Sequence, residues 1–319
     1  MTVARFIHAS PLAIIAIVAH AETHPDVLTI AADVVNPSIM SGEPAPGKMV
    51  LQTLPAYAGT DVAHAVYLPT DWVPGKRFPL IVEYRGNGAS VRENKGIGYA
   101  LSEGKGFIWA VLPLVSIDGK KDEAWWWGDV SATVAYAKAA VPKICQQWSG
   151  DPGRVVLAGY SRGAIACNYI GLHDAEIARL WCAIIAASHY DDGHIPWGMT
   201  PEEQSRAPER LRRLGETPQL ICGEHCSMPQ QGDDVRLREQ IRSRKLTTFA
   251  ATMAALDLTP ITKAEGTRNF IELHHPLGRY TLLDLPWVNH GSAVFQRETP
   301  ARRQVRDWLQ QAISAKVNK

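Results

Sequence analysis

A serine stands between two glycines near the middle of the chain, in the stretch LAGYSRGAI at residues 157–165. Gly159, Ser161 and Gly163 follow the spacing G-x-S-x-G, which is typical of a nucleophilic serine on a sharp turn between a strand and a helix. Such a turn strains the serine backbone and leaves no room for side chains at the two glycine positions. We therefore predict that Ser161 is a nucleophile; the alternative is a tight turn with an incidental serine.

The segments on either side of Ser161 are those that such a turn requires. The apolar run RVVLAGY at 154–160 predicts a strand, and residues 162–172 predict a helix that starts directly after the serine. The first amides of this helix would point toward the serine and favour a developing negative charge there.

Strands and helices alternate along most of the chain. Several predicted strands are nearly continuous apolar runs, as in a sheet that is covered on both faces. Pro142 is expected to break or kink the first long helix. The alternation predicts an α/β protein with a mostly parallel central sheet and helices on both faces. The predicted strands span residues 64–70, 78–84, 107–115, 154–160, 180–188, 219–224 and 269–274, and the predicted helices 130–145, 162–172, 201–214, 234–256 and 300–315.

With the serine turn in place, the chain resembles the α/β-hydrolase fold over roughly residues 60–315. WWWGD at 125–129 and DPGRVVLAGYSRG at 151–163 are similar to secreted polyhydroxybutyrate depolymerases and feruloyl esterases. The Ser161-Arg162 pair resembles glucuronoyl esterases, which also carry arginine after the serine. The resemblance implies a serine esterase whose triad follows in the order serine, acid, histidine.

A serine hydroxyl needs a nearby base that accepts its proton. The resemblance implies a histidine in the loop between the last strand and the final helix. His290, in DLPWVNHGSAVF ahead of the helix predicted from Pro300, has this position. His274 and His275, in IELHHPLGRY, are the alternatives, and they are otherwise typical of a strand end or a surface.

The acid that orients the histidine is left open. The resemblance implies an aspartate three residues beyond Gly223, but Cys226 stands there. Glu224 is the first candidate, because its longer side chain follows the glycine directly. Asp191, in the loop after the preceding strand, is the alternative, together with its neighbour Asp192.

An oxyanion hole, the pair of amides that binds the negatively charged oxygen of the intermediate, is implied by the same resemblance. Its donors would be the main-chain N–H of Arg162 and that of Gly86 or Asn87, in the turn after the strand predicted at 78–84. The alternative is an ordinary glycine turn. The Arg162 side chain could bind a substrate carboxylate or form a structural ion pair.

Three consecutive tryptophans, Trp125 to Trp127, suggest a substrate surface. An aromatic face suits a sugar ring or an aromatic acyl group, although the three rings could also cap the sheet. The predicted substrate-binding residues are Trp126, Trp127 and Tyr160, and residues 194–215 are a candidate lid.

The composition is that of a globular protein: 46% of the 319 residues are hydrophobic and 20% are charged. The formal net charge is +1, from 33 basic and 32 acidic residues, so no overall field would attract nucleic acid or a membrane surface. The expected partner is a small-molecule or polymeric ester substrate.

The first residues predict export. Arg5, an apolar run at 11–18 and Ala19-His20-Ala21 have the order of a signal peptide that is cleaved before Glu22. The predicted organisation is a signal peptide at 1–21, a leader segment at 22–59 and an α/β-hydrolase domain at 60–319. The mature protein would be secreted or periplasmic, and not bound to a membrane.

The cysteines do not predict a metal site. Cys222 and Cys226 flank His225, but no second pair stands at zinc spacing. Disulfides, whose connectivity is open, or buried thiols are favoured instead, and no metal or cofactor is expected. The five cysteines are Cys145, Cys167, Cys182, Cys222 and Cys226.

Together these patterns predict a secreted serine esterase that forms an acyl-enzyme through Ser161, His290 and an acid. Its substrate would be a polysaccharide-linked acyl ester, an aromatic ester or a polyester. The alternatives are a peptidase of the same fold and a catalytically inactive carbohydrate-binding relative.

Overall fold

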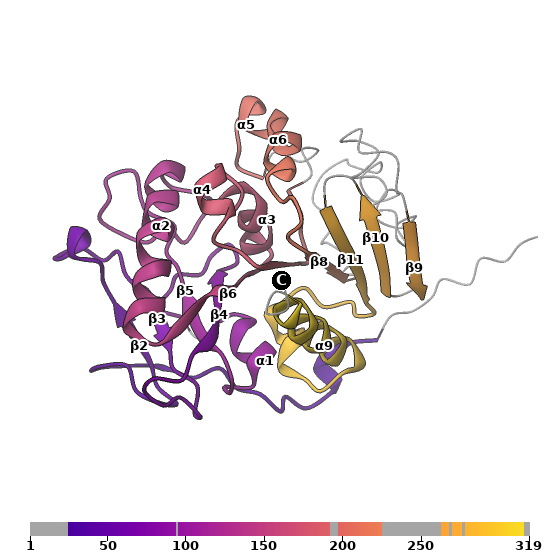
Figure 1. Cartoon of the computed structure of the whole chain (residues 1–319), viewed down its shortest axis with the longest axis horizontal. Helices are drawn as coiled ribbons and strands as arrows, with labels where there is room; N and C mark the ends of the chain where they lie inside the picture. Colours follow the sequence, from indigo (N-terminus) through magenta and orange to yellow (C-terminus); the bar gives the residue numbers. More distant parts are fainter. Residues whose placement is uncertain are drawn as a thin grey trace, which may run out of the picture.

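The computed structural model describes residues 25–93, 95–191, 197–224, 263–267, 270–275 and 278–315. Within these ranges, eleven strands form one sheet in the order β1-β2-β3-β5-β4-β6-β7-β8-β11-β10-β9 (Figure 1). Six neighbouring pairs are parallel and four are antiparallel. The strands are β1 Ile39–Met40, β2 Met49–Gln52, β3 His64–Tyr67, β4 Phe78–Tyr84, β5 Ile108–Val111, β6 Gly150–Tyr160, β7 Ala183–Ala187, β8 Gln219–Glu224, β9 Lys263–Thr267, β10 Phe270–His275 and β11 Gly278–Leu285.

The central six strands, from β5 through β4, β6, β7 and β8 to β11, are parallel to one another. Their carboxyl ends therefore meet at one edge of the sheet, where ligands of open α/β sheets bind. The chain leaves β6 at Ser161, β8 at Glu224 and β11 a few residues before His290. The topology thus brings three distant parts of the sequence to one edge.

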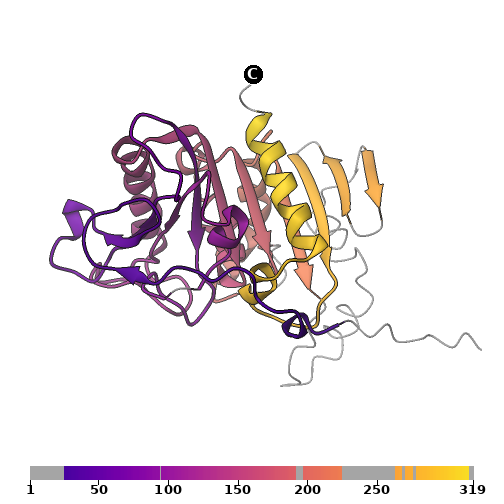
Figure 2. The same ribbon diagram turned by 90° about the horizontal axis from the view of Figure 1, so that it is seen from below.

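Helices cover both faces of the sheet (Figure 1). Side chains of β4 alternate between the two faces of the sheet. Leu80 and Val82 belong to the hydrophobic cluster beneath α2 (Val130–Gln147) and α3 (Arg162–Tyr169). Ile81 belongs to the cluster beneath α1 (Gly98–Ser102) and α9 (Pro300–Ser314). In the view from below, α9 (yellow) lies in front of the sheet (Figure 2). The predicted α/β architecture is confirmed. The helices are α1 Gly98–Ser102, α2 Val130–Gln147, α3 Arg162–Tyr169, α4 Ala175–Ala178, α5 Pro201–Ser205, α6 Ala207–Arg212 and α9 Pro300–Ser314, with short 3-10 turns η1 Val27–Thr29, η2 Pro55–Tyr57 and η3 Ser292–Gln296.

Two prolines act differently from expectation. α2 continues through Pro142, so the predicted break is wrong; Val141 and Ile144 on either side are buried against the sheet, and this burial outweighs one missing hydrogen bond. Residues 201–214 predict one helix, but a second helix begins at Ala207 with Pro208 in its first turn. The region 201–214 is therefore split at Arg206 into α5 and α6.

The amino-terminal part of the described chain joins the sheet. β2, from the predicted leader at 22–59, pairs antiparallel with β3, and β1 pairs with β2. The predicted signal peptide at 1–21 and the predicted helix at 234–256 lie outside the described residues. Among the described residues, no helix has the length and hydropathy needed to cross a membrane.

Four of the five cysteines are buried thiols, so none of them forms a disulfide. Cys145 lies on the buried side of α2, and Cys167 lies on α3. The fifth, Cys226, lies outside the described residues, as does His225. The described cysteines therefore act as small core side chains.

Candidate active site

Ser161 lies at a strained turn between β6 and α3. Its backbone is left-handed, with φ 55° and ψ −122°, a region that few residues other than glycine adopt. A Cβ atom at Gly159 would lie 2.0 Å from the main-chain oxygen of Gly163, and one at Gly163 would lie 1.9 Å from that of Tyr84. Both positions therefore require glycine, for the steric reason that the motif predicts.

The loop after β4 approaches this turn closely. A Cβ atom at Gly86 would lie 3.7 Å from the Cβ of Ser161. Arg162 is the first residue of α3, where main-chain N–H groups have no partner within the helix. Among the described residues, no acceptor takes the main-chain N–H of Arg162, Gly86 or Asn87. These amides are available to a ligand next to Ser161.

His290 and Glu224 come together from separate strands. Glu224 is the last residue of β8, and His290 follows β11 and precedes η3 and α9. The His290 Nδ1 lies 2.7 Å from Glu224 Oε1, and the two side chains are 35% and 1% exposed. Because Nδ1 faces Glu224, the other ring nitrogen, Nε2, faces away from the carboxylate.

The His290 loop is held by the start of the described chain. The Asn289 side chain accepts a hydrogen bond from the N–H of Val27 and donates one to Asp26, each at 2.7 Å. The N–H of Val288 donates to the carbonyl of Pro25. The imidazole is thus presented by a loop whose two preceding residues are anchored.

Tyr160, predicted to bind substrate, is buried, and its hydroxyl contacts Glu224. Its hydroxyl donates to Glu224 Oε1 at 2.9 Å and lies 3.0 Å from His290 Nδ1. The Tyr160 and His290 rings are 5.2 Å apart between centroids. Since Tyr160 directly precedes Ser161, the imidazole lies beside the serine turn. No hydrogen bond joins these described residues Ser161 and His290, and such contacts commonly tighten only when substrate binds.

Burial alone would raise the pKa of Glu224, but hydrogen bonds from His290, Ser188 and Tyr160 outweigh it. The pKa of Glu224 is therefore held below its ordinary value, and the side chain is a carboxylate at neutral pH. Burial, together with the charge of His290, lowers the pKa of His189 to about 4. His189 is thus a neutral neighbour of the pair.

Sequence reasoning missed Ser188 and His189, which follow β7 directly. Ser188 is left-handed, with φ 83°, and its hydroxyl lies 3.1 Å from His290 Nδ1 and 2.8 Å from His189 Nδ1. The His189 ring lies 5.2 Å from that of His290. The signal that could have found them was their place at the carboxyl end of a parallel strand.

Asp191, the alternative acid, has a different partner. Its two carboxylate oxygens accept hydrogen bonds from Arg210 at 2.7 and 2.9 Å, and both side chains are almost fully buried. Arg210 lies on α6, so the pair ties this helix to the loop after β7. Asp192 lies outside the described residues.

The Arg162 side chain points away from solvent and is 2% exposed. Its guanidinium donates to four main-chain carbonyls in two loops, so it is not available to a substrate carboxylate. Burial lowers the pKa of Arg162 to about 10, and it remains a cation at neutral pH. The four acceptors are the carbonyls of Arg85, Ala89, Glu123 and Trp126.

The three tryptophans separate into two environments. Trp127, predicted to bind substrate, is 4% exposed, and its indole N–H donates to the carbonyl of Trp197 at 2.8 Å. Trp125 and Trp126 are 65% and 40% exposed. They line a hollow of about 520 Å³ together with Lys121. Of the three tryptophans, Trp125 and Trp126 are therefore the two whose rings can present an apolar face to a ligand.

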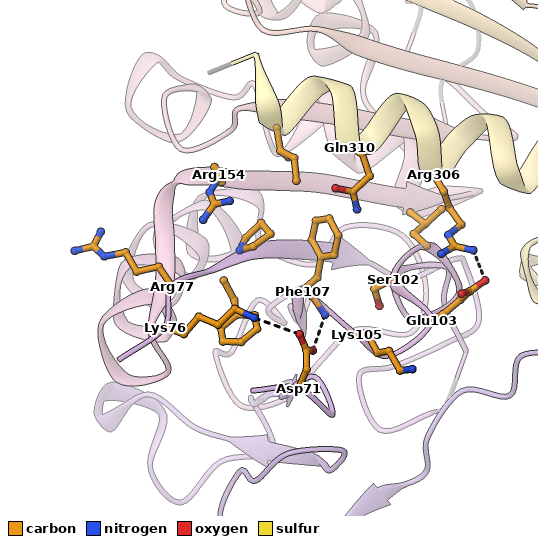
Figure 3. A pocket seen from close by; sticks show the side chains of 15 residues that line it. Asp71, Lys76, Arg77, Ser102, Glu103, Lys105, Phe107, Arg154, Arg306 and Gln310 are labelled. Atoms are coloured by element: carbon orange, nitrogen blue, oxygen red, sulfur yellow. Dashed lines mark hydrogen bonds and ion pairs between the residues drawn. The ribbon is translucent and has the colours of Figure 1, made fainter. Parts of the chain in front are cut away.

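A second hollow of about 440 Å³ lies at the amino end of β4, away from the serine turn (Figure 3). Ion pairs occupy its rim: Lys76 lies 3.5 Å from Asp71, and Arg306 pairs with Glu103. Basic side chains therefore meet acidic ones there.

Some predicted residues are only partly described. His274 and His275 end β10, and no more is described of them. Of the candidate lid, residues 197–215 contain α5 and α6, and residues 194–196 lie outside the described residues. Among the described residues, no group of three or more histidine, cysteine, aspartate or glutamate side chains is placed to hold a metal ion.

Comparisons with known proteins find likeness in structure but not in sequence. No family model and no curated protein matches the sequence. Thermogutta terrifontis esterase 2, in a form phosphoramylated by tabun, is similar at a TM-score of 0.51 and 16% identity, over 85% of this chain and 95% of that one. Acetyl xylan esterase from Aspergillus awamori gives a TM-score of 0.50 and 14% identity, over 83% of this chain and 99% of that one.

The AtxE2 isopeptidase, in a variant with Astexin3-dC4 bound, gives a TM-score of 0.50 and 16% identity over 84% of this chain. The chain spans only 40% of the length of that isopeptidase. With the sheet order and the helices on both faces, these likenesses show that the protein has the α/β-hydrolase fold.

Proposed function

We propose that the protein is a serine hydrolase that cleaves carboxylic esters through an acyl-enzyme, with Ser161 as nucleophile, His290 as base and Glu224 as the orienting acid. The observation that carries this proposal is the contact between Glu224 and His290 beside the strained turn of Ser161. A carboxylate on Nδ1 leaves Nε2 as the nitrogen that can accept the serine proton. The same fold in two named esterases is consistent with this chemistry.

The Ser161 Oγ attacks the ester carbonyl carbon, and its proton moves to His290 Nε2. The tetrahedral intermediate collapses when the imidazolium returns this proton to the leaving alcohol. Water then attacks the acyl-enzyme with His290 again as base, which releases the acid and restores Ser161. Glu224 stays ionised and stabilises the imidazolium.

The negative charge that develops on the carbonyl oxygen needs donors that are already in place. The N–H of Arg162, at the start of α3, is the first proposed donor, and Gly86 or Asn87 supplies the second. Gly86 supports this role because its backbone lies next to Ser161. These amides together form the proposed oxyanion hole.

Glu224 is favoured over Asp191 as the acid. Asp191 is occupied on both oxygens by Arg210, whose permanent charge already neutralises it. Glu224 has the imidazole as its partner instead.

The proposal includes an exported enzyme, with a signal peptide at 1–21, that acts outside the cytoplasm or in the periplasm. Its substrate is a polysaccharide-linked acyl ester, an aromatic ester or a polyester. The exposed faces of Trp125 and Trp126 favour esters that carry a ring over simple aliphatic polyesters.

The test is labelling with a fluorophosphonate, followed by hydrolysis of p-nitrophenyl acetate and of its amide analogue p-nitroacetanilide. We expect the wild-type protein to be labelled at Ser161 and to cleave the ester but not the amide. Ser161→Ala should lose both labelling and hydrolysis. Absence of labelling in the folded wild type would favour an inactive binding protein, and cleavage of the amide that depends on Ser161 would favour a peptidase.

A further inference from the structure

We infer that the side chains of Asn87 and Arg162 hold Trp126 in place as a specificity-determining wall for the acyl group of the substrate. The inference rests on the proposed function, because it takes the main-chain amides of these two residues as part of the oxyanion hole. It adds that their side chains shape the acyl side of the site. Oxyanion binding and acyl recognition would then depend on one connected set of contacts.

Trp126 has a strained backbone in an unusual setting. Its φ is 51°, in the left-handed region that is rare for an aromatic residue. Such strain persists only where the surroundings impose it, and it occurs frequently at functional sites. The Trp126 side chain is nevertheless 40% exposed, so burial of the indole does not by itself explain the strain.

Hydrogen bonds to the Trp126 main chain impose this conformation. Its N–H donates to Asn87 Oδ1 at 2.9 Å, and its carbonyl accepts from Arg162 Nη1 at 2.9 Å. Both polar groups of one strained residue are therefore held by the side chains of two proposed oxyanion-hole residues. Asn87 and Arg162 act here as positioning residues.

The remaining contacts of Arg162 extend this connection. Its guanidinium also donates to Arg85 and Ala89, on the loop that carries Asn87, and to Glu123, on the segment that carries Trp126. A planar group with five donors can bridge two loops in this way, and a lysine cannot. The oxyanion loop and the tryptophan segment are thus joined as one unit.

Two glycines leave space for the rings of Trp125 and Trp126. A Cβ atom at Gly198 would lie 2.7 Å from the Trp126 ring, and one at Gly88 would lie 3.2 Å from the Trp125 ring. The adjoining hollow of about 520 Å³ is within the size range of small-molecule sites. A ring-sized acyl group would fit there.

The chemistry of the reaction favours the acyl side over the alcohol side. The leaving alcohol must receive a proton from His290, so it lies on the side of the imidazole. The carbonyl oxygen lies at the amides of Arg162 and Asn87. Trp126, whose main chain is held by these same two residues, is then the wall for the remaining substituent, the acyl group.

The test is the ratio of kcat/KM for p-nitrophenyl benzoate to that for p-nitrophenyl acetate, which share a leaving group. Trp126→Gly accepts the left-handed backbone without strain and lacks the indole. We expect it to lower this ratio by about tenfold, the scale of losing a well-packed apolar contact. Trp72→Phe, which removes an indole bonded to Trp148 at the other end of α2, is the matched control and should leave the ratio unchanged.

A second pair of variants tests the positioning role. Asn87→Ala keeps the main-chain amide and removes the acceptor for Trp126, so the ratio should fall by about threefold. Asn87→Asp restores an acceptor and should restore the ratio, although its charge near the oxyanion slows both esters. The ratio cancels this slowing because both substrates develop the same negative charge at the same amides.

The outcomes separate the inference from the proposed function. If hydrolysis depends on Ser161 but Trp126→Gly leaves the ratio unchanged, the inference fails and the esterase proposal stands. An effect found only when the alcohol is varied would overturn the acyl assignment. Failure of Asn87→Asp to restore the ratio would overturn the positioning role of Asn87. A wild-type protein that is not labelled by fluorophosphonate would overturn the esterase proposal itself.

Discussion

Two buried carboxylates lie after neighbouring strands at the same edge of the sheet, and they differ in their partners. Asp191 follows β7 and pairs through both oxygens with Arg210. Glu224 ends β8 and pairs through one oxygen with His290. Arginine cannot give up its proton, whereas an imidazole can gain and lose one at neutral pH. Only the second pair can take part in proton transfer, and the first can only stabilise the fold.

The partner, and not the carboxylate itself, decides what an acid at this edge can do. The two acids therefore have two different readouts. Changes at Glu224 should act on catalysis, and changes at Asp191 should act on the free energy of unfolding.

The largest expected effect is on catalysis at Glu224. Glu224→Gln keeps the shape of the side chain but loses the charge that holds the His290 tautomer, so kcat should fall by about 10⁴. Asp191→Asn should keep kcat per folded molecule within about threefold of wild type. The measurement is p-nitrophenyl acetate hydrolysis, normalised to folded protein by circular dichroism. An equal loss in a folded Asp191→Asn variant would assign the acid to Asp191.

The next effect is on stability at Asp191. Asp191→Ala leaves the buried Arg210 without its carboxylate and should cost about 3–5 kcal/mol of unfolding free energy. The double variant Asp191→Leu with Arg210→Leu should recover most of this loss, because it removes both charges. Urea unfolding checks both values. A single variant as stable as wild type would show that this pair does not hold α6.

A third effect concerns pH and His189, which lies two residues before Asp191 and has its ring 5.2 Å from that of His290. Its pKa is lowered to about 4, so the unfolded chain binds this proton more readily than the folded one. Stability should be complete above about pH 6.5 and should fall by about 3 kcal/mol as the pH drops to about 4.

His189→Gln should flatten the stability profile over this range, as measured by urea unfolding at several pH values. His64, whose pKa burial also lowers to about 4, is a matched site far from the pair, and it contributes in the same range. A slope that is unchanged in His189→Gln would show that His189 is not held neutral.

The smallest effect is at Tyr160. Tyr160→Phe removes a hydrogen bond to the Glu224 carboxylate, so the pKa of Glu224 should rise and the acid limb of kcat/KM should move to higher pH. The rate at neutral pH should fall by about tenfold, the scale of one hydrogen bond to a charged group. Tyr169→Phe, which removes a bond to Glu203 on the Asp191 side, is the control. It should leave the acid limb in place.

Much of the fold could be predicted from local patterns. The apolar runs at 78–84 and 219–224 match β4 and β8 because strands buried on both faces need such runs. The run at 107–115 predicts a longer strand than exists, because β5 ends at Val111, just before Pro113. Residues 201–214 predict one helix, but α6 starts a second one at Ala207, with Pro208 in its first turn.

The site was less predictable, because its side chains face partners from distant segments. The direction of Tyr160 could have been read from strand alternation, since Val156, Ala158 and Tyr160 all belong to the same face of β6. The role of the Arg162 guanidinium could not, because its acceptors are carbonyls in two loops far away in the sequence. Every residue has a main-chain carbonyl, so a pattern of side-chain types does not predict which carbonyls a guanidinium will reach.

The sequence by itself determined the bend at Ser161, because two glycines and a serine between an apolar strand and a helix permit few other backbones. It also determined the alternation of strands and helices that builds the parallel sheet. Only the tertiary structure decided which carboxylate meets the imidazole. That choice depends on where Arg210 and His290 arrive through the packing of α6 and the order of β8 and β11, and a pairing between distant charges has no local signature.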